Sequence, residues 1–413
     1  MKLTLKYNKL FLLLQIIVIY SNLVGKYDAT IVGCVLYADG IGRSTISTID
    51  MLKNDLNMNF IMTNEKVNFK DVSLQVKKII QNPDQTPGNV CFFLDVLSYP
   101  TYNPWLKAPE SIIKIAYTML ESTAIPPRWV NIINNYFDAI AVPDDWLVSI
   151  YENCGVKKPI FVLPCALYLE DFLRKPLKRK AKKPFSFGVS AACVPGKNQE
   201  TLIQAFASEF GNNPDVQLII HSRGGPTLDF IKQTIKTNHC TNIKYLIKSI
   251  SHQDYVHFIY SLDCYCLLSE GEGFSITCRE ALAAGIPCII SNNTAHTKIC
   301  DTGYVKSVKA ERLKPAYYAT FNTICGYKFG CTVADAQLAL RDIYDNYSVH
   351  LDKAHKGREW VKQYTLENMR DQYLMLLKPR KIILGTKNSI EKDCLTTNSE
   401  ALYKKYQTLK AEF

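Results

Sequence analysis

The chain has 413 residues, of which 47% are hydrophobic and 21% charged, and its formal net charge is +11 at pH 7. These proportions are those of an ordinary globular protein, and the length is sufficient for two domains with separate cores. The composition excludes a low-complexity chain, and the sequence holds no internal repeat.

The N-terminus has the pattern of a targeting segment. Three lysines precede an apolar run at 10–19, as in a signal peptide. The run is too short to span a bilayer comfortably, and residues 21–25 fit the small-residue rule for a cleavage site poorly. Residues 1–27 are therefore either a signal or membrane anchor or a plain N-terminal extension, and no later stretch predicts a transmembrane helix.

Residues 28–173 alternate between strand and helix patterns. A buried strand is predicted at 29–37, and Ser44 is expected to cap a helix that continues to about Leu56. Such alternation is typical of parallel β-α-β units that are covered on both faces. Further strands are predicted at 58–63, 90–97, 112–117, 138–142 and 159–163, and helices at 69–81, 127–136 and 144–153.

A strongly basic run follows at 174–183. It carries seven basic residues and no acidic one. One interpretation is a solvated linker at 174–184. The other is binding to a polyanion or a membrane surface, in which case the chain would be a membrane- or nucleic-acid-surface binding protein built around this run.

The alternating pattern restarts after the basic run and covers residues 185–353. A strand is predicted at 185–189, and Asn198 begins an amphipathic helix. The fold class is therefore α/β, with two Rossmann-like halves that face a central cleft, where ligands bind at the carboxyl ends of the strands. Further strands are predicted at 216–221, 243–247, 263–268, 287–291 and 303–305.

The C-terminal residues 354–413 have mainly helical patterns. A long amphipathic helix is predicted at 354–377, and the mixed tail that follows ends in a helical pattern at about 399–409.

The fourteen cysteines are scattered along the chain without a C-x-x-C pair. Most of them stand in apolar runs, so they are expected to be buried thiols in a reducing compartment rather than disulfides or zinc ligands. The seven histidines show no metal-ligand spacing, and each is expected to be structural or exposed. Neither a G-x-S-x-G elbow nor a Walker motif occurs.

The most informative stretch lies between two predicted strands of the second half. A glycine loop, Gly271-Glu272-Gly273, leads into a short helix that contains Glu280. Backbone N–H groups and the helix dipole favour an anion such as a phosphate at this helix N-terminus. Each glutamate also has a simpler interpretation, because Glu272 lies in a turn and Glu280 completes a capping box with Thr277.

Two further loops are candidates for ligand contacts. Lys197 lies after a predicted strand and just before a helix, where it can neutralise a diphosphate or can be a surface lysine beside the helix N-cap. Residues 39–43 form a lone G-x-G, and Thr45 stands where a dinucleotide fingerprint requires its third glycine. This argues against an NAD site, while Gly40 and Gly42 would still let a substrate approach the backbone.

The glycine loop and its helix resemble the E-x7-E signature of GT-B glycosyltransferases of the family-4 type. Glu272 and Glu280 have the required spacing, a Gly-Phe pair follows the first glutamate, and an Ala-x-Gly-x-Pro pattern ends at Pro287. The resemblance covers about residues 28–377 and implies the GT-B fold, in which the last helix crosses back to the first half.

Two other stretches support this resemblance. Residues 186–206 are similar to the strand, loop and helix that carry the family's phosphate-binding lysine. Residues 117–143 are similar to the acceptor domain of one branch of these enzymes. The first half is therefore expected to be the acceptor side, and residues 185–353 the nucleotide-sugar side.

The resemblance implies a role for each matching residue. Glu280 would bind the ribose hydroxyls of a nucleotide, and Glu272 would bind hydroxyls of the donor sugar. Lys197 would hold the diphosphate in place of a metal, together with backbone amides at the start of the helix. Those amides belong to Gly273, Phe274 and Ser275.

The implied activity is transfer of a hexosyl group from a UDP- or GDP-linked sugar, with retention of anomeric configuration. A fixed cation and a helix N-terminus would stabilise the charge that develops on the leaving nucleoside diphosphate. No cofactor and no dedicated metal site are expected.

The chain departs from the family pattern at one position that bears on activity. The family usually has an arginine five positions before the lysine, and this position is Ala192 here. Arg223 is a hypothetical replacement for the missing charge. Without a second cation, the alternative is an inactive relative that binds a nucleotide sugar or a glycan without turnover.

The acceptor side is less readable from the sequence. Gly40 and Gly42 would let a sugar or acceptor approach the first loop, and Asp95, Tyr99 and Glu121 are further candidates, of which Glu121 is the best. An internal salt bridge is the equally simple interpretation of Glu121.

The acceptor itself is expected to be a glycan, a lipid or a protein, and no nucleic acid partner is expected for a transferase. The N-terminal apolar segment and the basic run at 174–183 could contact a membrane surface. Nucleotide sugars are mainly cytosolic, which favours the cytoplasm or the cytoplasmic face of a membrane, with export by an N-terminal signal as the alternative.

Overall fold

The structure is a computed structural model, and it describes residues 26–36, 40–69, 71–319 and 322–378. The signal or anchor predicted at the N-terminus and the helical pattern predicted at 399–409 lie outside these residues. The described residues up to Leu377 belong to one compact unit. Within them, no helix combines the length and the hydropathy that crossing a membrane requires.

The first half is built on a six-stranded sheet in the order β2-β1-β3-β4-β5-β6. All neighbouring strands are parallel, and the residues of β1 are almost all buried, as expected for a sheet with both faces covered. The strands are β1 (Tyr27–Leu36), β2 (Met58–Asn68), β3 (Gly88–Leu94), β4 (Ile113–Tyr117), β5 (Ala139–Val142) and β6 (Ile160–Val162).

The second half repeats this architecture with the strand order β12-β11-β10-β7-β8-β9, again all parallel. The two sheets confirm the predicted α/β class. The prediction of a strand at 303–305 is wrong, because the last strand of this second sheet begins only at Lys306. The strands are β7 (Phe185–Ser190), β8 (Val216–Ser222), β9 (Ile243–Ile247), β10 (Cys264–Leu267), β11 (Cys288–Asn292) and β12 (Lys306–Lys309).

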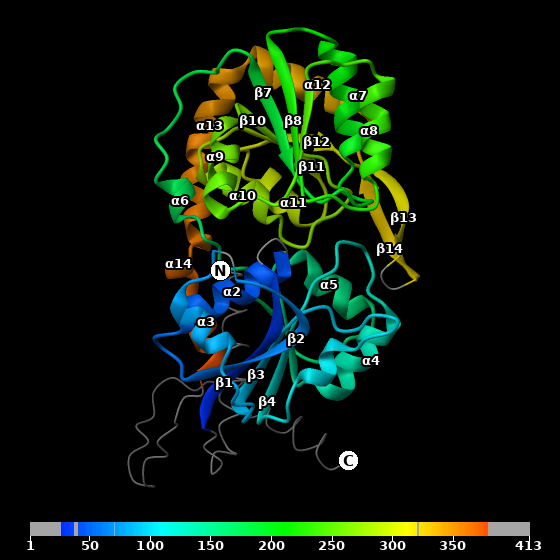
Figure 1. Ribbon diagram of the computed structural model, residues 1–413. Coiled ribbons are helices and arrows are strands. Elements are labelled where there is room, and N and C mark those ends of the chain that lie inside the picture. The colour runs from blue at the N-terminus through cyan, green and yellow to red at the C-terminus, as the bar shows by residue number, and fades with distance from the viewer. Residues whose placement is uncertain (1–25, 37–39, 70, 320–321, 379–413) are drawn as a thin grey trace, which may run out of the picture. The chain divides into compact units, whose positions relative to one another are not determined.

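Helices connect successive strands and cover the two sheets (Figure 1). In the first half they are α2 (Gly40–Leu52), α3 (Leu74–Ile80), η2 (Pro104–Lys107), α4 (Pro127–Tyr136), α5 (Trp146–Asn153) and, beyond β6, α6 (Glu170–Leu173). In the second half they are α7 (Gln199–Phe210), α8 (Leu228–Thr237), α9 (His252–Ser261), α10 (Ile276–Ala283), α11 (Thr294–Cys300) and α12 (Val333–Asp345).

The first helix of the described residues, α2, includes residues before its predicted start. α2 already includes Gly40, so Ser44 is not its N-cap. The hydroxyl of Ser44 instead donates to the carbonyl oxygen of Gly40 one turn back, at 3.0 Å. This is the back-bonding that serine makes inside a helix.

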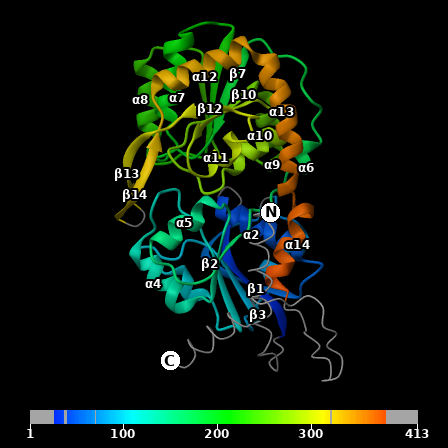
Figure 2. The same ribbon diagram turned by 180° about the vertical axis from the view of Figure 1, so that it is seen from behind.

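The helix predicted at 354–377 is interrupted. α13 (Tyr347–Val361) is followed by the short turn η3 (Lys362–Tyr364) and by α14 (Leu366–Leu377). Leu167 of the first half donates its backbone N–H to the carbonyl oxygen of Tyr364 at 2.8 Å, and this contact lies at the break. α13 packs on α10 and α14 packs on α2, so the chain returns to the first half here (Figure 2).

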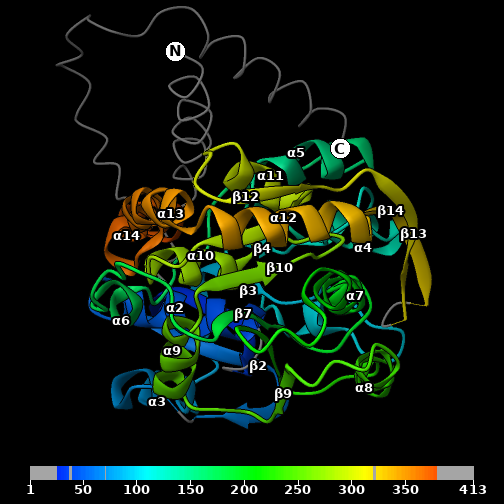
Figure 3. The same ribbon diagram turned by 90° about the horizontal axis from the view of Figure 1, so that it is seen from above.

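An antiparallel hairpin that was not predicted links the two halves. It consists of β13 (Arg312–Tyr318) and β14 (Thr323–Gly330) and lies on the opposite side from α6 and α13 (Figure 1 and Figure 3). Cys325 belongs to the hydrophobic core of the first half, and Thr123 donates its N–H to the carbonyl oxygen of Tyr327 at 3.1 Å.

The cysteines confirm the expectation of buried thiols. All thirteen in the described residues are free, and eleven of them are buried.

The basic run is only partly the solvated linker that was predicted. Lys178 is buried. Its ammonium donates to the carbonyl oxygen of Leu262 and lies 3.5 Å from a carboxylate oxygen of Asp263. Burial lowers the pKa of Lys178. This lysine therefore anchors the segment to the second half, while Arg179, Lys180, Lys182 and Lys183 are exposed.

Candidate functional site

A cleft of about 560 Å³ lies where the carboxyl ends of the strands of both halves meet. This is the position at which open parallel sheets bind ligands. Of the site residues predicted from the sequence, the cleft is lined by Gly40, Glu121, Lys197, Arg223, Glu272, Gly273, Phe274 and Ser275. Gly42 and Glu280 are not among the lining residues.

The glycine loop fits tightly against the first half. A Cβ added to Gly271 would stand 2.0 Å from the backbone oxygen of Glu121, and one added to Gly273 would stand 2.8 Å from the side chain of Met119. Only glycine allows approaches this close. The two glycines are therefore required for packing against the first half.

Ser275 occupies the N-cap position of α10 in a left-handed conformation, with φ 61° and ψ 65°. Its hydroxyl lies 2.8 Å from Nε2 of His296, and Nδ1 of His296 lies 3.0 Å from the carbonyl oxygen of Ser291. Burial lowers the pKa of His296 to about 4. The imidazole is therefore neutral at pH 7, and it holds the strained residue at the start of α10. This is a structural histidine, as predicted.

Lys197 and Glu272 form an ion pair at the cleft surface. Nζ of Lys197 lies 2.6 Å from Oε1 of Glu272. Burial alone would raise the pKa of Glu272, but the charge of Lys197 and the hydrogen bond that its ammonium donates to the carboxylate outweigh burial, so the pKa of Glu272 lies below its usual range. Asn198 occupies the N-cap position of α7, yet its side chain makes no capping hydrogen bond.

Glu280 is completely buried in α10. A guanidinium nitrogen of Arg43, from α2 of the first half, pairs with its Oε1, and the hydroxyl of Tyr255 donates to its Oε2 at 2.9 Å. The capping box predicted with Thr277 is wrong, because Ser275 is the N-cap residue and the carboxylate of Glu280 contacts these two side chains instead. Sequence reasoning placed Arg43 in the first loop but gave it no role.

Arg279, next to Glu280, lies in a cage of aromatic rings. Its guanidinium carbon is 3.8 Å from the ring centre of Phe274 and 4.8 Å from that of Tyr364. It is fully buried and lies 4.0 Å from Asp144 of the first half. Burial raises the pKa of Asp144 to about 6, and its Oδ2 has no hydrogen-bond partner. Phe274 is thus held between the cleft and a buried cation.

The loop that contains Ala192 is tied to the loop that contains Arg223. Cys193 donates its N–H to the carbonyl oxygen of Gly224 at 3.0 Å. A Cβ on Gly225 would stand 2.2 Å from the carbonyl oxygen of Cys193. Both Ala192 and Arg223 line the cleft, so the structure brings the hypothetical replacement arginine to the same wall as the missing one.

The acceptor-side candidates divide into two groups. Tyr99 and Glu121 line the cleft. Tyr318, from the hairpin that was not predicted, also lines it and donates its hydroxyl to Oε2 of Glu121 at 3.3 Å. Because hairpin and loop are almost 200 positions apart in sequence, no local pattern could have revealed this contact.

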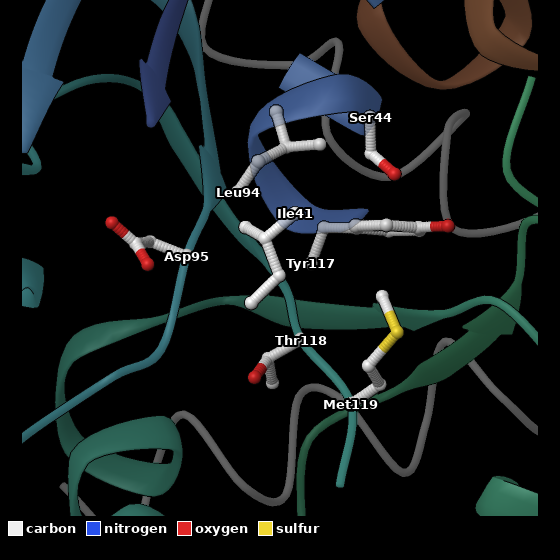
Figure 4. A pocket seen from close by; sticks show the side chains of 7 residues that line it. All are labelled: Ile41, Ser44, Leu94, Asp95, Tyr117, Thr118 and Met119. Carbon is white, nitrogen blue, oxygen red and sulfur yellow. The ribbon is translucent and has the colours of Figure 1, made fainter. Parts of the chain in front are cut away.

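Asp95 and Gly42 lie elsewhere. Asp95 borders a separate pocket of only about 10 Å³, where its carboxylate points away from Tyr117 and Met119 (Figure 4) and accepts a hydrogen bond from Thr63. A Cβ on Gly42 would stand 2.4 Å from the carbonyl oxygen of Leu36. Gly42 therefore serves the packing of α2 on β1 rather than the approach of a ligand.

Residues 170–315 match the family model described as Glycosyl transferases group 1. The match includes Lys197, Glu272 and Glu280. No curated protein sequence matches the chain. Among the described residues, no cluster of histidine, cysteine, aspartate and glutamate has the arrangement of a metal site.

Three solved structures show what the fold is similar to. Sucrose-phosphate synthase from Thermosynechococcus elongatus is 12% identical, with 84% of this chain and 97% of that chain covered, and a TM-score of 0.62. Anabaena HepE in complex with UDP-glucose is 12% identical, with 85% and 99% covered, and a TM-score of 0.58. TarM is 14% identical with a TM-score of 0.52, and the match spans 70% of this chain and about half of TarM, 54%.

These structural similarities show that the chain has the GT-B fold, as predicted. Together with the group 1 match over the second half, they support a GT-B glycosyltransferase.

Proposed function

We propose that the chain is a glycosyltransferase that moves a hexosyl group from a UDP- or GDP-linked sugar to an acceptor, with retention of configuration, and that it is of the family-4 type. The observation that carries this proposal is the ion pair of Lys197 and Glu272 beside the N-terminus of α10, with the buried Glu280 one helix turn further along. One cation, one helix N-terminus and two carboxylates meet the needs of a diphosphate and of sugar hydroxyls.

In this proposal each group has a separate task. Glu280 binds the ribose hydroxyls, and Glu272 binds hydroxyls of the donor sugar. The backbone N–H groups of Gly273, Phe274 and Ser275 receive the diphosphate. Lys197 stabilises the charge that develops on the leaving nucleoside diphosphate, as a fixed cation does in a water-poor site, so that we propose no dedicated metal and no cofactor.

The proposed division of the chain follows from these tasks. Residues 28–173 would be the acceptor side, 185–353 the donor side, 174–184 the connection, and 354–413 the crossing segment and tail. Glu121 and Gly40 face the acceptor in this proposal. The acceptor would be a glycan, a lipid or a protein, reached in the cytoplasm or at the cytoplasmic face of a membrane.

A thermal-shift screen against UDP-, GDP- and ADP-sugars tests the donor site. A ligand at a hundred times its Kd should stabilise the protein by about 2.7 kcal/mol. Lys197→Ala and Glu280→Ala should lose the shift, whereas Arg370→Ala should keep it, because Arg370 pairs with Asp55 in the turn that follows α2. No shift with any donor would contradict the proposal.

The alternative function is that of an inactive relative that binds a nucleotide sugar or a glycan without turnover. Ala192 favours this alternative, because it stands where the family pattern has an arginine. Release of free nucleoside diphosphate from the donor that gives the shift separates the two. Slow donor hydrolysis that disappears in Lys197→Ala supports the transferase, and binding without any hydrolysis or transfer supports the binding protein. The anomer of the released sugar, read by NMR, tests retention.

A further inference from the structure

We propose that Arg43 is the second cation of the donor site. In the ligand-free protein it is paired with Glu280, and on nucleotide binding it moves from this carboxylate to the diphosphate. Arg43 is thus a donor-binding residue that substitutes, from the first half, for the arginine missing at Ala192. The inference rests on the proposed function and assigns this residue within the same site.

The two glutamates of the E-x7-E signature are paired in the same way. Glu272 is paired with Lys197, and Glu280 is paired with Arg43. In both pairs the carboxylate is the more buried partner, with side-chain exposures of 10% and 0%, and the cation borders the cleft, with 26% and 16%. The cation that the sequence identified therefore has a counterpart on the second glutamate.

Glu280 cannot receive a ribose in this arrangement. Arg43 contacts one carboxylate oxygen, Tyr255 contacts the other, and the side chain has no exposed surface. Tyr255 lies in α9 of the second half, and burial keeps the pKa of its hydroxyl well above the usual range, so it is a neutral donor that stays with Glu280. Both Tyr255 and Arg43 line the cleft, but Arg43 comes from the opposite half and is the charged partner that a diphosphate attracts, so it is the one that leaves.

The place to which Arg43 can move is set by its position in α2. It lies in the first turn of this helix, and a Cβ added to Gly40 would stand only 3.8 Å from the side chain of Ile276, the first residue of α10. The N-terminus of α2 therefore faces the N-terminus of α10, where the proposed diphosphate binds. A guanidinium can grip two phosphate oxygens at once, which an ammonium cannot.

The exchange leaves every charged group hydrogen-bonded. Ribose and sugar hydroxyls replace the cations on Glu280 and Glu272, and phosphate oxygens replace the carboxylates on Arg43 and Lys197. Hydrogen bonds to ionised partners are made on both sides of this exchange, so no buried charge is left alone, which would be costly. A nucleoside without phosphates cannot complete the exchange, because it removes Arg43 from Glu280 and offers the guanidinium nothing.

This expected difference between nucleoside and diphosphate binding can be tested. Dissociation constants for uridine, guanosine, UDP and GDP are measured by calorimetry on the full chain, with wild type, Arg43→Ala, Arg43→Lys and the surface control Arg370→Ala. Arg43→Ala should bind the diphosphate about tenfold or more weakly, because a charge-assisted contact is lost. It should bind the matching nucleoside more tightly, because Glu280 is uncovered. Arg43→Lys should restore part of the diphosphate affinity.

The inference holds only if Arg43→Ala changes the affinities for the nucleoside and for the diphosphate in opposite directions. Structural damage to the site would weaken nucleoside and diphosphate together, and this result, or no change in either, would overturn the inference. It would also be overturned if Arg223→Ala, rather than Arg43→Ala, selectively weakened the diphosphate. If wild type binds neither UDP nor GDP, the proposed function fails and the inference falls with it, whereas every other outcome leaves the donor site in place.

Discussion

Removing the buried carboxylate of Asp144 should stabilise the protein at neutral pH. Asp144 is 1% exposed, and its Oδ2 has no hydrogen-bond partner. A guanidinium nitrogen of Arg279 lies 4.0 Å from this oxygen, and the charges of Lys298 and Arg279 lower the pKa of Asp144 by less than burial raises it. A charge in this position gains too little from its neighbours to offset the loss of water. Asp144→Asn keeps the shape of the neutral acid and removes the charge.

The expected change in the free energy of unfolding follows from the pKa of Asp144. Burial raises the pKa of Asp144 from 3.8 to about 6 in the folded state, so the folded protein holds this proton more tightly than the unfolded chain. Stability from this group is therefore complete below pH 4 and is lost as the pH rises through 6. At about 1.4 kcal/mol per pKa unit, the charged form costs about 3 kcal/mol above pH 7.

The assay is urea unfolding of wild type, Asp144→Asn and the surface control Asp229→Asn at several pH values. His296 titrates in the opposite sense, because its pKa is lowered to about 4 and its contribution is lost as the pH falls. Only the difference between variant and wild type therefore reports on Asp144. This difference should grow by about 1–2 kcal/mol between pH 5 and pH 8.

Asp229 is the matched control because its side chain is 99% exposed and lies 3.7 Å from Lys232. Its removal should change the free energy of unfolding by at most about 1 kcal/mol. The reasoning is refuted if Asp144→Asn is less stable than wild type at pH 8, or if the difference between them does not depend on pH. The first result would mean that the attraction of Lys298 and Arg279 outweighs desolvation, and the second that folding does not raise the pKa of Asp144.

Two further substitutions test the packing of the site. Lys197→Ala removes the cation from the buried carboxylate of Glu272 and should lower the free energy of unfolding by about 1–3 kcal/mol at pH 7. The double variant that also carries Glu272→Gln should recover part of this loss in urea unfolding. Gly271→Ala places a Cβ 2.0 Å from the backbone oxygen of Glu121 and should lower both the Tm and the affinity for UDP or GDP. Gly40→Ala is the control for the Tm, since the nearest atom to its Cβ lies at 3.8 Å, and equal losses in the two glycine variants would contradict the packing argument.

The sheets were predictable from the sequence because their strands are buried on both faces. Continuous apolar runs such as those of β1 and β3 have no other simple interpretation once helical patterns lie between them. Helix ends were less predictable. α2 already includes Gly40, whereas the sequence led to the prediction that Ser44 caps this helix.

The hairpin and the break after α13 escaped prediction for a common reason. β14 is stabilised on one side by the first half, where Cys325 joins the core, and its outward residues such as Ile324 and Tyr327 are exposed. Its pattern is therefore that of an irregular surface segment. The break at Lys362–Tyr364 coincides with a backbone hydrogen bond from Leu167, a residue of the first half that no helical periodicity reveals.

In the site, too, residues that are close in sequence could be predicted, whereas contacts between residues far apart in sequence could not. The proposed donor groups Glu272 and Glu280 stand eight positions apart on one loop and helix, so a local sequence pattern could carry the resemblance that implies their roles. Arg43 lies 237 positions from its partner Glu280, and Tyr318 lies 197 positions from Glu121. Both contacts exist only because the two halves and the hairpin are folded against each other. If the second cation is supplied in this way, the loss of an arginine at Ala192 is no sign of an inactive site, because the charge has moved to the other wall of the cleft.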